Sequence, residues 1–348
     1  MDAIALFNKV RSDMATTYSE RIPEANVNNI TTIQSIMSDG GNINVVNDFM
    51  STLLNKLTKT VLITKIFENP LKALKKGHKP LGDGVEEIYN NFIKGEKFDQ
   101  TGANLLSRNL PDTKTVYHRK NYEMQYPITI NRDVLVKAFS SWEAFEAYCE
   151  SVIATLHNSA ELDEFSNMKQ LLAIAIKNKA VKTINVVDPC ESEANAKKFI
   201  KEVKTTSRLM TFPNSNFNAY LDAQTTDTKP IITFSRKNEQ ILFLDAEVDT
   251  TVSIDVLAST FNMTVAEFND TRKVVIDMFP EIEGGIIRGM LVDEQFFQIF
   301  DDFIAITNFY NAKGLYTNYY LTIIQTIAYS ILVNAVAFVV DTTASTTE

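Results

Sequence analysis

The chain contains very little cysteine, histidine or tryptophan. Its 348 residues include two cysteines, three histidines and one tryptophan. Cys149 and Cys190 lie 41 positions apart without a second pair, so the sequence supports neither a disulfide framework nor a cysteine-based zinc site and fits a reducing compartment. His78, His118 and His157 lie in three different segments, whereas a metal site needs ligands that converge at defined spacing. We therefore expect no metal ion and no other cofactor.

Basic residues are outnumbered, and the sequence motifs of common enzymes are absent. There are 34 basic and 43 acidic residues, giving a formal charge of −9. This balance argues against dedicated DNA or RNA binding, because neutralising phosphates requires a basic surface. The chain has no GxSxG, HExxH, CxxC or GxGxxG motif. Gly77 and Gly82 have P-loop spacing, but Asp83 stands where the phosphate-binding lysine is required. We expect that the protein is not an enzyme.

One uncharged stretch, residues 318–340, is long enough to span a lipid bilayer. Polar residues such as Thr322, Gln325 and Asn334 interrupt it, and its β-branched and aromatic residues suit buried strands better. A membrane-anchored protein that uses residues 319–340 stays the alternative from a different class. We favour a chain with no membrane segment.

The first 130 residues show little sign of a core of their own. Residues 1–60 are rich in Asn, Thr, Ser and Ile and predict an N-terminal arm with one short helix. Residues 61–130 predict an extended loop with many turns and with strands at 61–67 and 113–130. A loop of about seventy residues in a compact domain is uncommon and usually serves function or assembly.

The clearest local signal is a long helix over residues 140–178. Apolar residues recur at three- and four-residue steps without Pro or Gly, and Ser140 with Glu143 has the spacing of a capping box. A helix of about 38 residues would be roughly 57 Å long, which exceeds ordinary globular helices. Because heptads do not persist, we interpret it as a spine.

The remaining residues predict a mixed α/β layer domain over 181–312, followed by buried strands within 313–340. The pattern in the α/β domain predicts a helix at 191–210, a second helix start at the capping box of Thr264 and Glu267, and short strands at 183–187, 231–234, 241–244, 273–278 and 286–292.

Opposite charges gather in two separate segments. Seven lysines and one acid lie between Lys56 and Lys79, whereas residues 142–168 contain no Lys or Arg. The two segments are either solvated faces that never meet or complementary surfaces of neighbouring copies, with complementarity setting register and association rate. The candidate inter-subunit residues are Lys72, Lys75, Lys76 and Lys79 in the extended loop, and Glu143, Glu146, Glu150, Glu161, Asp163 and Glu164 on the spine helix.

Short motifs, in order along the chain, give a resemblance to a known family. They are Asn69-Pro-Leu-Lys-Ala-Leu-Lys-Lys-Gly77, Pro80-Leu-Gly82, Val85-Glu-Glu-Ile-Tyr89, Ala138-Phe-Ser-Ser-Trp142, Asn158-Ser-Ala-Glu161, Gly314-Leu-Tyr316, Asn318-Tyr-Tyr320 and Asn334-Ala-Val-Ala-Phe-Val339. Each is weak alone, but the ordered set covers roughly residues 45–340. In this respect the chain resembles the major capsid (head) protein of small short-tailed, protein-primed bacteriophages of the salasvirus type.

The resemblance implies the α+β fold shared by tailed-phage capsid proteins and encapsulins. On that plan the chain has an N-terminal arm (1–60), an extended loop (61–130), a peripheral domain with the spine helix (131–180 and 313–348) and an axial domain (181–312). The loop would lie over the spine helix of an adjacent copy.

The resemblance also implies self-assembly into pentamers and hexamers of an icosahedral or elongated shell. That shell would enclose double-stranded DNA, with a scaffolding protein and a portal as further partners, and would be assembled in the host cytoplasm. The alternative on the same fold is an encapsulin-like cellular nanocompartment, which would hold a protein cargo instead of DNA.

Overall fold

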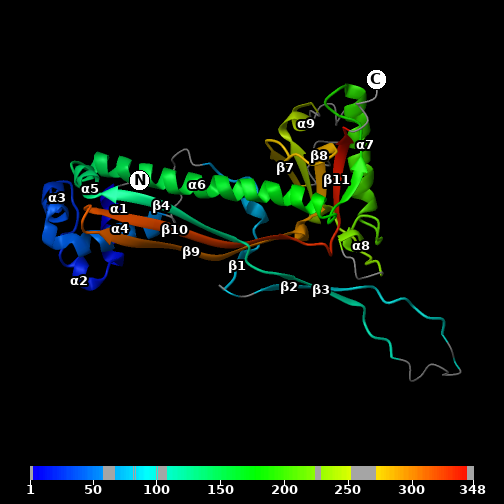
Figure 1. Ribbon diagram of the computed structural model, residues 1–348, viewed down its shortest axis with the longest axis horizontal. Helices are drawn as coiled ribbons and strands as arrows, with labels where there is room; N and C mark the ends of the chain where they lie inside the picture. Colours follow the sequence, from blue (N-terminus) through cyan, green and yellow to red (C-terminus); the bar gives the residue numbers. More distant parts are fainter. Residues whose placement is uncertain are drawn as a thin grey trace. The chain divides into compact units, whose positions relative to one another are not determined.

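A computed structural model describes residues 3–57, 67–80, 82, 84–98, 100, 108–223, 229–251 and 272–342 (Figure 1). The chain divides into two compact units. The first unit comprises Met1–Asn69, Asn121–Phe165 and Asp301–Gln325, and the second comprises Pro70–Lys120, Ser166–Phe300 and Thr326–Glu348. None of the helices in the described parts of the chain is both long and apolar enough to cross a membrane.

The N-terminal residues of the first unit form helices around an aromatic core, not an arm with one short helix. Phe7 and Phe49 are fully buried, with ring centroids 4.8 Å apart, and Phe139 stacks on Phe145 at 4.9 Å. The expectation of a core-free segment is therefore wrong, because apolar residues on each short helix face the same cluster. The helices are α1 (Ala3–Asp13), α2 (Thr16–Ser19), α3 (Ile30–Ser38), α4 (Ile43–Leu57) and α5 (Arg132–Ala138).

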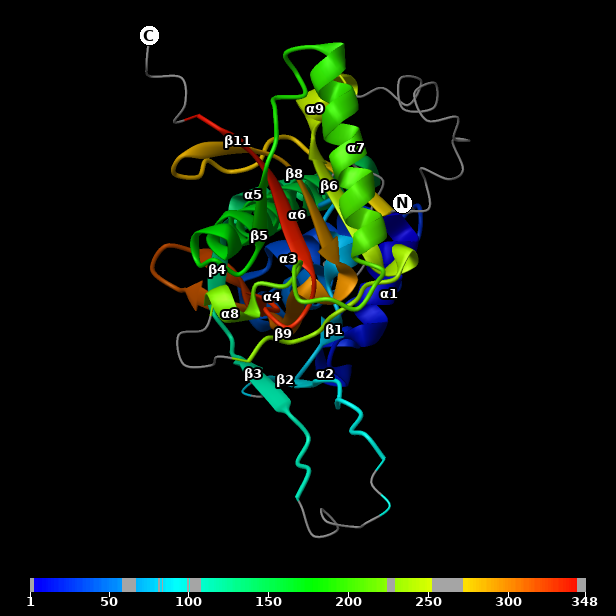
Figure 2. The same ribbon diagram turned by 90° about the vertical axis from the view of Figure 1, so that its right-hand side faces the viewer.

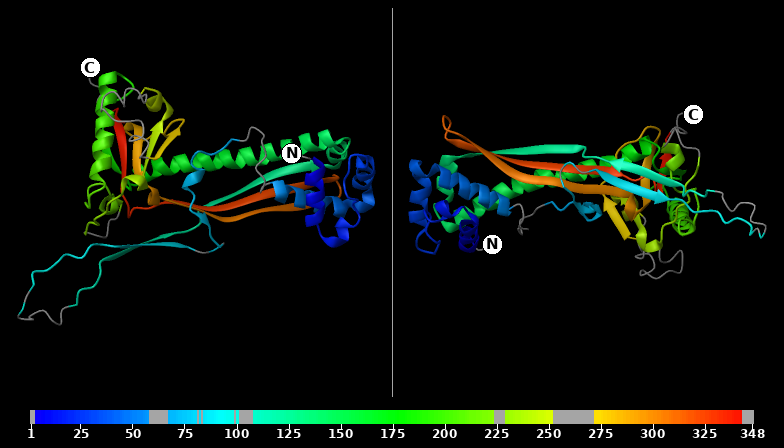
Figure 3. Two further views of the ribbon diagram at one scale, coloured as in Figure 1. Left: turned by 180° about the vertical axis from the view of Figure 1, so that it is seen from behind. Right: turned by 90° about the horizontal axis from the view of Figure 1, so that it is seen from below.

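Long strands complete the first unit. β4 (Tyr122–Asn131) pairs antiparallel with β10 (Tyr316–Tyr329), from Tyr316 opposite Asn131 to Gln325 opposite Tyr122, and β9 (Phe297–Asn311) borders β10 on its other side. Figure 3 shows the N-terminal helices gathered near the turn between β9 and β10. Sequence patterns predict β10 but miss β9, and they merge β3 (Thr113–His118) with β4 into one strand.

The long helix is confirmed as α6 (Trp142–Lys177), which has 36 residues and runs through both units. Its cap lies one residue later than predicted, because the Ser141 hydroxyl, not Ser140, accepts a hydrogen bond from the Ala144 N–H at 3.1 Å. Phe145, Cys149 and Leu156 on its first part are buried in the core of the first unit.

The second unit contains a five-stranded sheet with strand order β5-β11-β8-β6-β7. Figure 2 shows α7 (Glu193–Leu209) running beside this sheet, and its Phe199 packs against Phe338 at 5.7 Å between ring centroids. The predicted strand at 231–234 is reduced to an isolated bridge between Asn214 and Thr233. The strands are β5 (Lys182–Asn185), β6 (Gln240–Asp245), β7 (Arg272–Ile276), β8 (Gly285–Asp293) and β11 (Ala335–Asp341), and the short helices are α8 (Tyr220–Ala223) and α9 (Ala246–Thr251).

The predicted strand at 61–67, except for its last position Phe67, and the predicted capping box of Thr264 and Glu267 lie outside the described residues. The second unit also holds the first strands of the predicted extended loop. They are β1 (Gly77–His78), which borders the start of β9, and β2 (Val85–Asn90), which pairs with β3.

Candidate inter-subunit contact surfaces

The extended loop contains a two-stranded ribbon, defined here as residues 85–98 and 108–118. β2 and β3 pair antiparallel from Val85 opposite His118 to Asn90 opposite Thr113. Successive side chains of a strand point to opposite faces, so each face carries every second residue. The alternating burial of both strands shows one face turned toward the protein and the other toward solvent.

The four candidate lysines precede the ribbon in the second unit, and they differ in environment. Lys72 is exposed and Lys75 is half-buried. The Lys76 ammonium donates to Gln295 Oε1 at 2.5 Å, and its desolvation lowers the pKa of this lysine. Lys79 is buried. Lys76, like Lys72, is exposed although it bonds to Gln295 of its own chain, and Lys79 is the least accessible of the four.

The six candidate acids lie on the part of α6 that belongs to the first unit. Glu143 is exposed, and hydrogen bonds from its own backbone N–H and from Ser141 lower its pKa. Asp163 accepts a hydrogen bond from the Tyr126 hydroxyl at 3.0 Å. The other four divide by burial: Glu146 and Glu150 are half-buried, and Glu161 and Glu164 are buried.

The ribbon also carries exposed apolar side chains, which the charge pattern does not reveal. Phe98 is 85% exposed and Leu110 is 83% exposed, and exposed apolar side chains gathered in one segment mark an interaction surface. In the sequence, these side chains could have been identified as apolar residues that recur within a turn-rich loop. The set comprises Ile88, Phe92, Ile93, Phe98, Leu110 and Tyr117.

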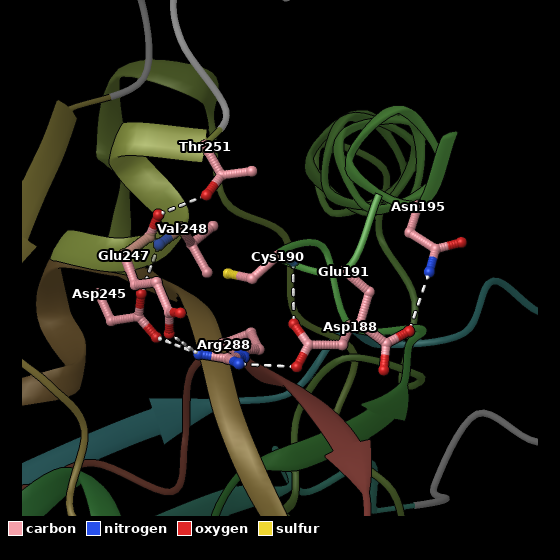
Figure 4. Close-up of polar contacts among 9 residues, drawn as sticks. All are labelled: Asp188, Cys190, Glu191, Asn195, Asp245, Glu247, Val248, Thr251 and Arg288. Atoms are coloured by element: carbon pink, nitrogen blue, oxygen red, sulfur yellow. Dashed lines mark hydrogen bonds and ion pairs between the residues drawn. The ribbon is translucent and has the colours of Figure 1, made fainter. Parts of the chain in front are cut away.

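Another charged cluster lies in the α/β part of the second unit, around Arg288 of β8 (Figure 4). Its guanidinium binds Asp188 Oδ2 at 2.7 Å, Glu247 Oε2 at 2.8 Å and Asp245 Oδ2 at 3.3 Å. Although desolvation acts in the opposite direction, the hydrogen bond from Arg288 lowers the pKa of Asp188. The arginine joins the loop after β5, the end of β6 and α9, which is a structural role.

Neither cysteine has the environment of a nucleophile. Burial raises the pKa of Cys149 to about 12, and desolvation also raises the pKa of Cys190, which lies beside Arg288 in Figure 4. Within the described ranges, no three His, Cys, Asp or Glu side chains are grouped so that they could hold a metal ion.

The sequence of the chain is similar to the sequences of phage capsid proteins. Residues 7–339 match the family described as Phi29-like phage major capsid protein. The major capsid protein of Bacillus phage PZA is 31% identical over 336 residues, spanning 96% of this chain and 72% of that protein. The major capsid protein of Streptococcus phage Cp-1 is 26% identical over 291 residues, spanning 81% of this chain and 77% of that protein.

The structural similarity agrees with the similarity in sequence. A chain from the capsid structure of Staphylococcus phage Andhra superimposes with a TM-score of 0.64 at 13% identity, covering 81% of this chain and 86% of that one. This similarity confirms the tailed-phage capsid fold. The sequence relatives are phage capsid proteins, so they do not favour a cellular nanocompartment. The chain belongs to the family of Phi29-like phage major capsid proteins.

Proposed function

We propose that copies of this chain assemble as pentamers and hexamers into the head shell of the virion, with double-stranded DNA inside. Membership of a family of phage major capsid proteins carries the proposal. The exposed apolar side chains of the ribbon support self-association, because burying them is favourable only when another surface covers them. Contacts of this heterologous kind close into rings and shells when the rotation between copies closes.

Each segment has a proposed role in the shell. Residues 1–60 act as an arm toward neighbours in spite of their internal helices, and residues 61–130 act as the extended loop. Residues 131–180 and 313–348 form the peripheral domain, and residues 181–312 form the axial domain that meets its copies at the capsomer centre. A scaffolding protein and a portal are the further partners, and the protein has no catalytic activity.

We retain the proposed contact between the basic loop and the acidic part of α6 of a neighbouring copy. Its members that are not buried are Lys72, Lys75 and Lys76 on one side and Glu143, Glu146 and Glu150 on the other. Because surface charges act through long-range attraction, the contact should affect register and association rate more than affinity, and it should weaken as salt increases.

Charge reversal tests this contact. Reversing all four lysines to Glu is expected to leave the subunit folded and to prevent closed shells. Since Lys79 is buried and Lys76 donates to Gln295 of the same chain, the sharper variant is Lys72→Glu with Lys75→Glu. Lys201→Glu with Lys237→Glu, in the same unit, is the matched control. Normal shells from the Lys72/Lys75 variant, seen by electron microscopy and sedimentation velocity, would refute the electrostatic contact.

The enclosed nucleic acid is tested separately. Native particles, treated with nuclease on the outside, should release DNA of uniform genome length when they are opened. Particles that hold protein cargo and no protected DNA would overturn the virion assignment and leave only self-assembly.

A further inference from the structure

The ribbon is attached to its own subunit along its inner face. Glu87 of β2 and His118 of β3 face the same side, and their Oε2 and Nε2 atoms are 2.7 Å apart. The other Glu87 oxygen, Oε1, accepts a hydrogen bond from Gln298 Nε2 at 2.6 Å. Gln298 lies near the start of β9 and within the second unit, as the ribbon does. One carboxylate therefore joins both strands of the ribbon to β9.

A second attachment lies two residues further along β2, at Tyr89. The Tyr89 hydroxyl donates to the carbonyl oxygen of Ile232. Asn91 Nδ2 donates to the Pro230 carbonyl at 3.0 Å, and the Ile232 N–H donates back to Asn91 Oδ1 at 3.2 Å. Since Glu87 and Tyr89 are two residues apart on one strand, the two attachments occupy the same face.

Among the residues that the structure describes, the polar contacts of the opposite face stay within the ribbon. Thr113 Oγ1 donates to Asn90 Oδ1 at 2.8 Å, and the Tyr117 hydroxyl donates to Glu86 Oε1 at 2.8 Å. These bonds join β2 to β3 but do not tie either strand to the rest of the unit. An isolated two-stranded hairpin is at best marginally stable in water, so pairing alone would leave β2 and β3 largely open.

We propose that residues 85–91 and 112–118 form a stem that is fixed on its own subunit before any second copy binds. The Glu87–Gln298 and Tyr89–Ile232 bonds hold the stem in place. The fixed stem sets the position from which the loop extends toward a neighbouring copy. The apolar residues beyond the stem, which contact that copy, are Phe92, Ile93, Phe98 and Leu110. The effect on assembly rests on the proposed function, whereas the attachment of the stem does not.

Hydrogen exchange of the full-length chain, kept below its assembly threshold, tests the attachment. We expect the amides of β2 and β3 to be protected. Tyr89→Phe combined with Gln298→Ala should lower this protection at least tenfold, because the net contribution of each bond corresponds to roughly a fivefold to tenfold change in the equilibrium. Thr113→Ala, which removes a bond within the ribbon only, is the matched control and should change protection little.

The amides of β6 and β8 report whether the variant has folded, and they should keep their protection. If β2 and β3 exchange at unprotected rates in the unmodified chain, the stem is not fixed and the proposal is overturned. Unchanged protection in the double variant of a folded chain would overturn the role of the two bonds.

The assembly threshold of the same variants, measured by sedimentation velocity, separates the two proposals. We expect the double variant to need at least a tenfold higher concentration to form large particles, and Thr113→Ala to assemble normally. A loosened stem with an unchanged threshold would support the attachment but refute the ribbon as an inter-subunit element. Failure of the unmodified chain to form particles, alone or with a scaffold, would refute the proposed function itself.

Discussion

Replacing Arg288 should destabilise the second unit strongly. In the variant Arg288→Met the apolar stem of the side chain is largely kept, but Asp188 and Asp245 lose the charge they bind. The Arg288 side chain is only 11% exposed and that of Asp245 only 7%. Removing one partner of a buried ion pair usually costs about 3–5 kcal/mol, because the other charge is left without compensation. Glu247 is largely exposed and should add little.

Chemical denaturation of the unassembled chain at neutral pH measures this loss. Arg236→Met makes the same chemical change in the same unit, at an exposed arginine whose ion pair with Glu239 spans 3.8 Å. We expect this control to change the free energy of unfolding by less than about 0.5 kcal/mol. A loss of under about 1 kcal/mol for Arg288→Met would refute the reasoning, since it would mean that the carboxylates are solvated.

The dependence of the free energy of unfolding on pH gives an independent check, because the direction of the change can be worked out. The pKa of Asp188 is lowered in the folded chain, so its pairing stabilises the native state above the unfolded pKa of about 3.9. That contribution is lost as the pH falls through the lower, folded pKa. In Arg288→Met the arginine no longer lowers this pKa, so protonating Asp188 relieves the buried charge. The difference in the free energy of unfolding between the unmodified chain and Arg288→Met should therefore become smaller in acid. A difference that grows in acid would contradict the pairing of Asp188 with Arg288.

Two further predictions concern packing. Phe7→Ala should cost about 3–5 kcal/mol, because Phe7 is fully buried against Phe49, whereas Phe98→Ala removes an exposed ring and should leave the stability of the unassembled subunit nearly unchanged in thermal unfolding. Gly285→Ala should cost about 1–3 kcal/mol, since its Cβ would lie 2.6 Å from Val339 Cγ1 and 2.8 Å from the Val340 carbonyl oxygen, and Gly95→Ala, with no atom within 4 Å, is its control. If the two variants of either pair lose the same amount of stability, the packing contacts of Phe7 or of Gly285 are not formed.

How well the sequence predicted the fold depended on how local the signal was. The 36-residue helix α6 could be predicted from its uninterrupted periodicity, and the strands β6 and β8 from their short apolar runs, because both signals lie in neighbouring residues. The helices of residues 1–57 have four to 15 residues, a length at which isolated helices are marginal in water, and α2, α3 and α4 contain Thr, Ser or Asn, which have a low helix propensity. Their stability comes from packing around Phe7 and Phe49, and such tertiary contacts are not visible in a single sequence.

The candidate contact residues show a different limit. Composition identifies a basic and an acidic segment correctly, but it cannot show which charges face solvent. Glu161, Glu164 and Lys79 are buried, and Lys76 binds Gln295 of the same chain. Long side chains can bury much of their length and still satisfy their charge locally, so a run of charges overestimates the charge available to a partner. The contrast between the segments is therefore a weaker predictor of assembly than the exposed apolar residues.

The stem explains why an extended ribbon can serve assembly without a large entropic penalty. Fixing the backbone of one residue costs about 1–2 kcal/mol, so ordering a long free loop on a partner would consume most of the gain from contact. Where residues 85–91 and 112–118 are already held by Gln298 and Ile232, that cost belongs to folding of the subunit. Contact with a second copy through the described residues 92–98 and 108–111 then starts from a stem that is already in place. If the Glu87–Gln298 and Tyr89–Ile232 bonds are lost, the entropic cost of ordering the stem is paid when a second copy binds instead of when the subunit folds. Removing these bonds should therefore raise the concentration needed for assembly more than it lowers the stability of the subunit.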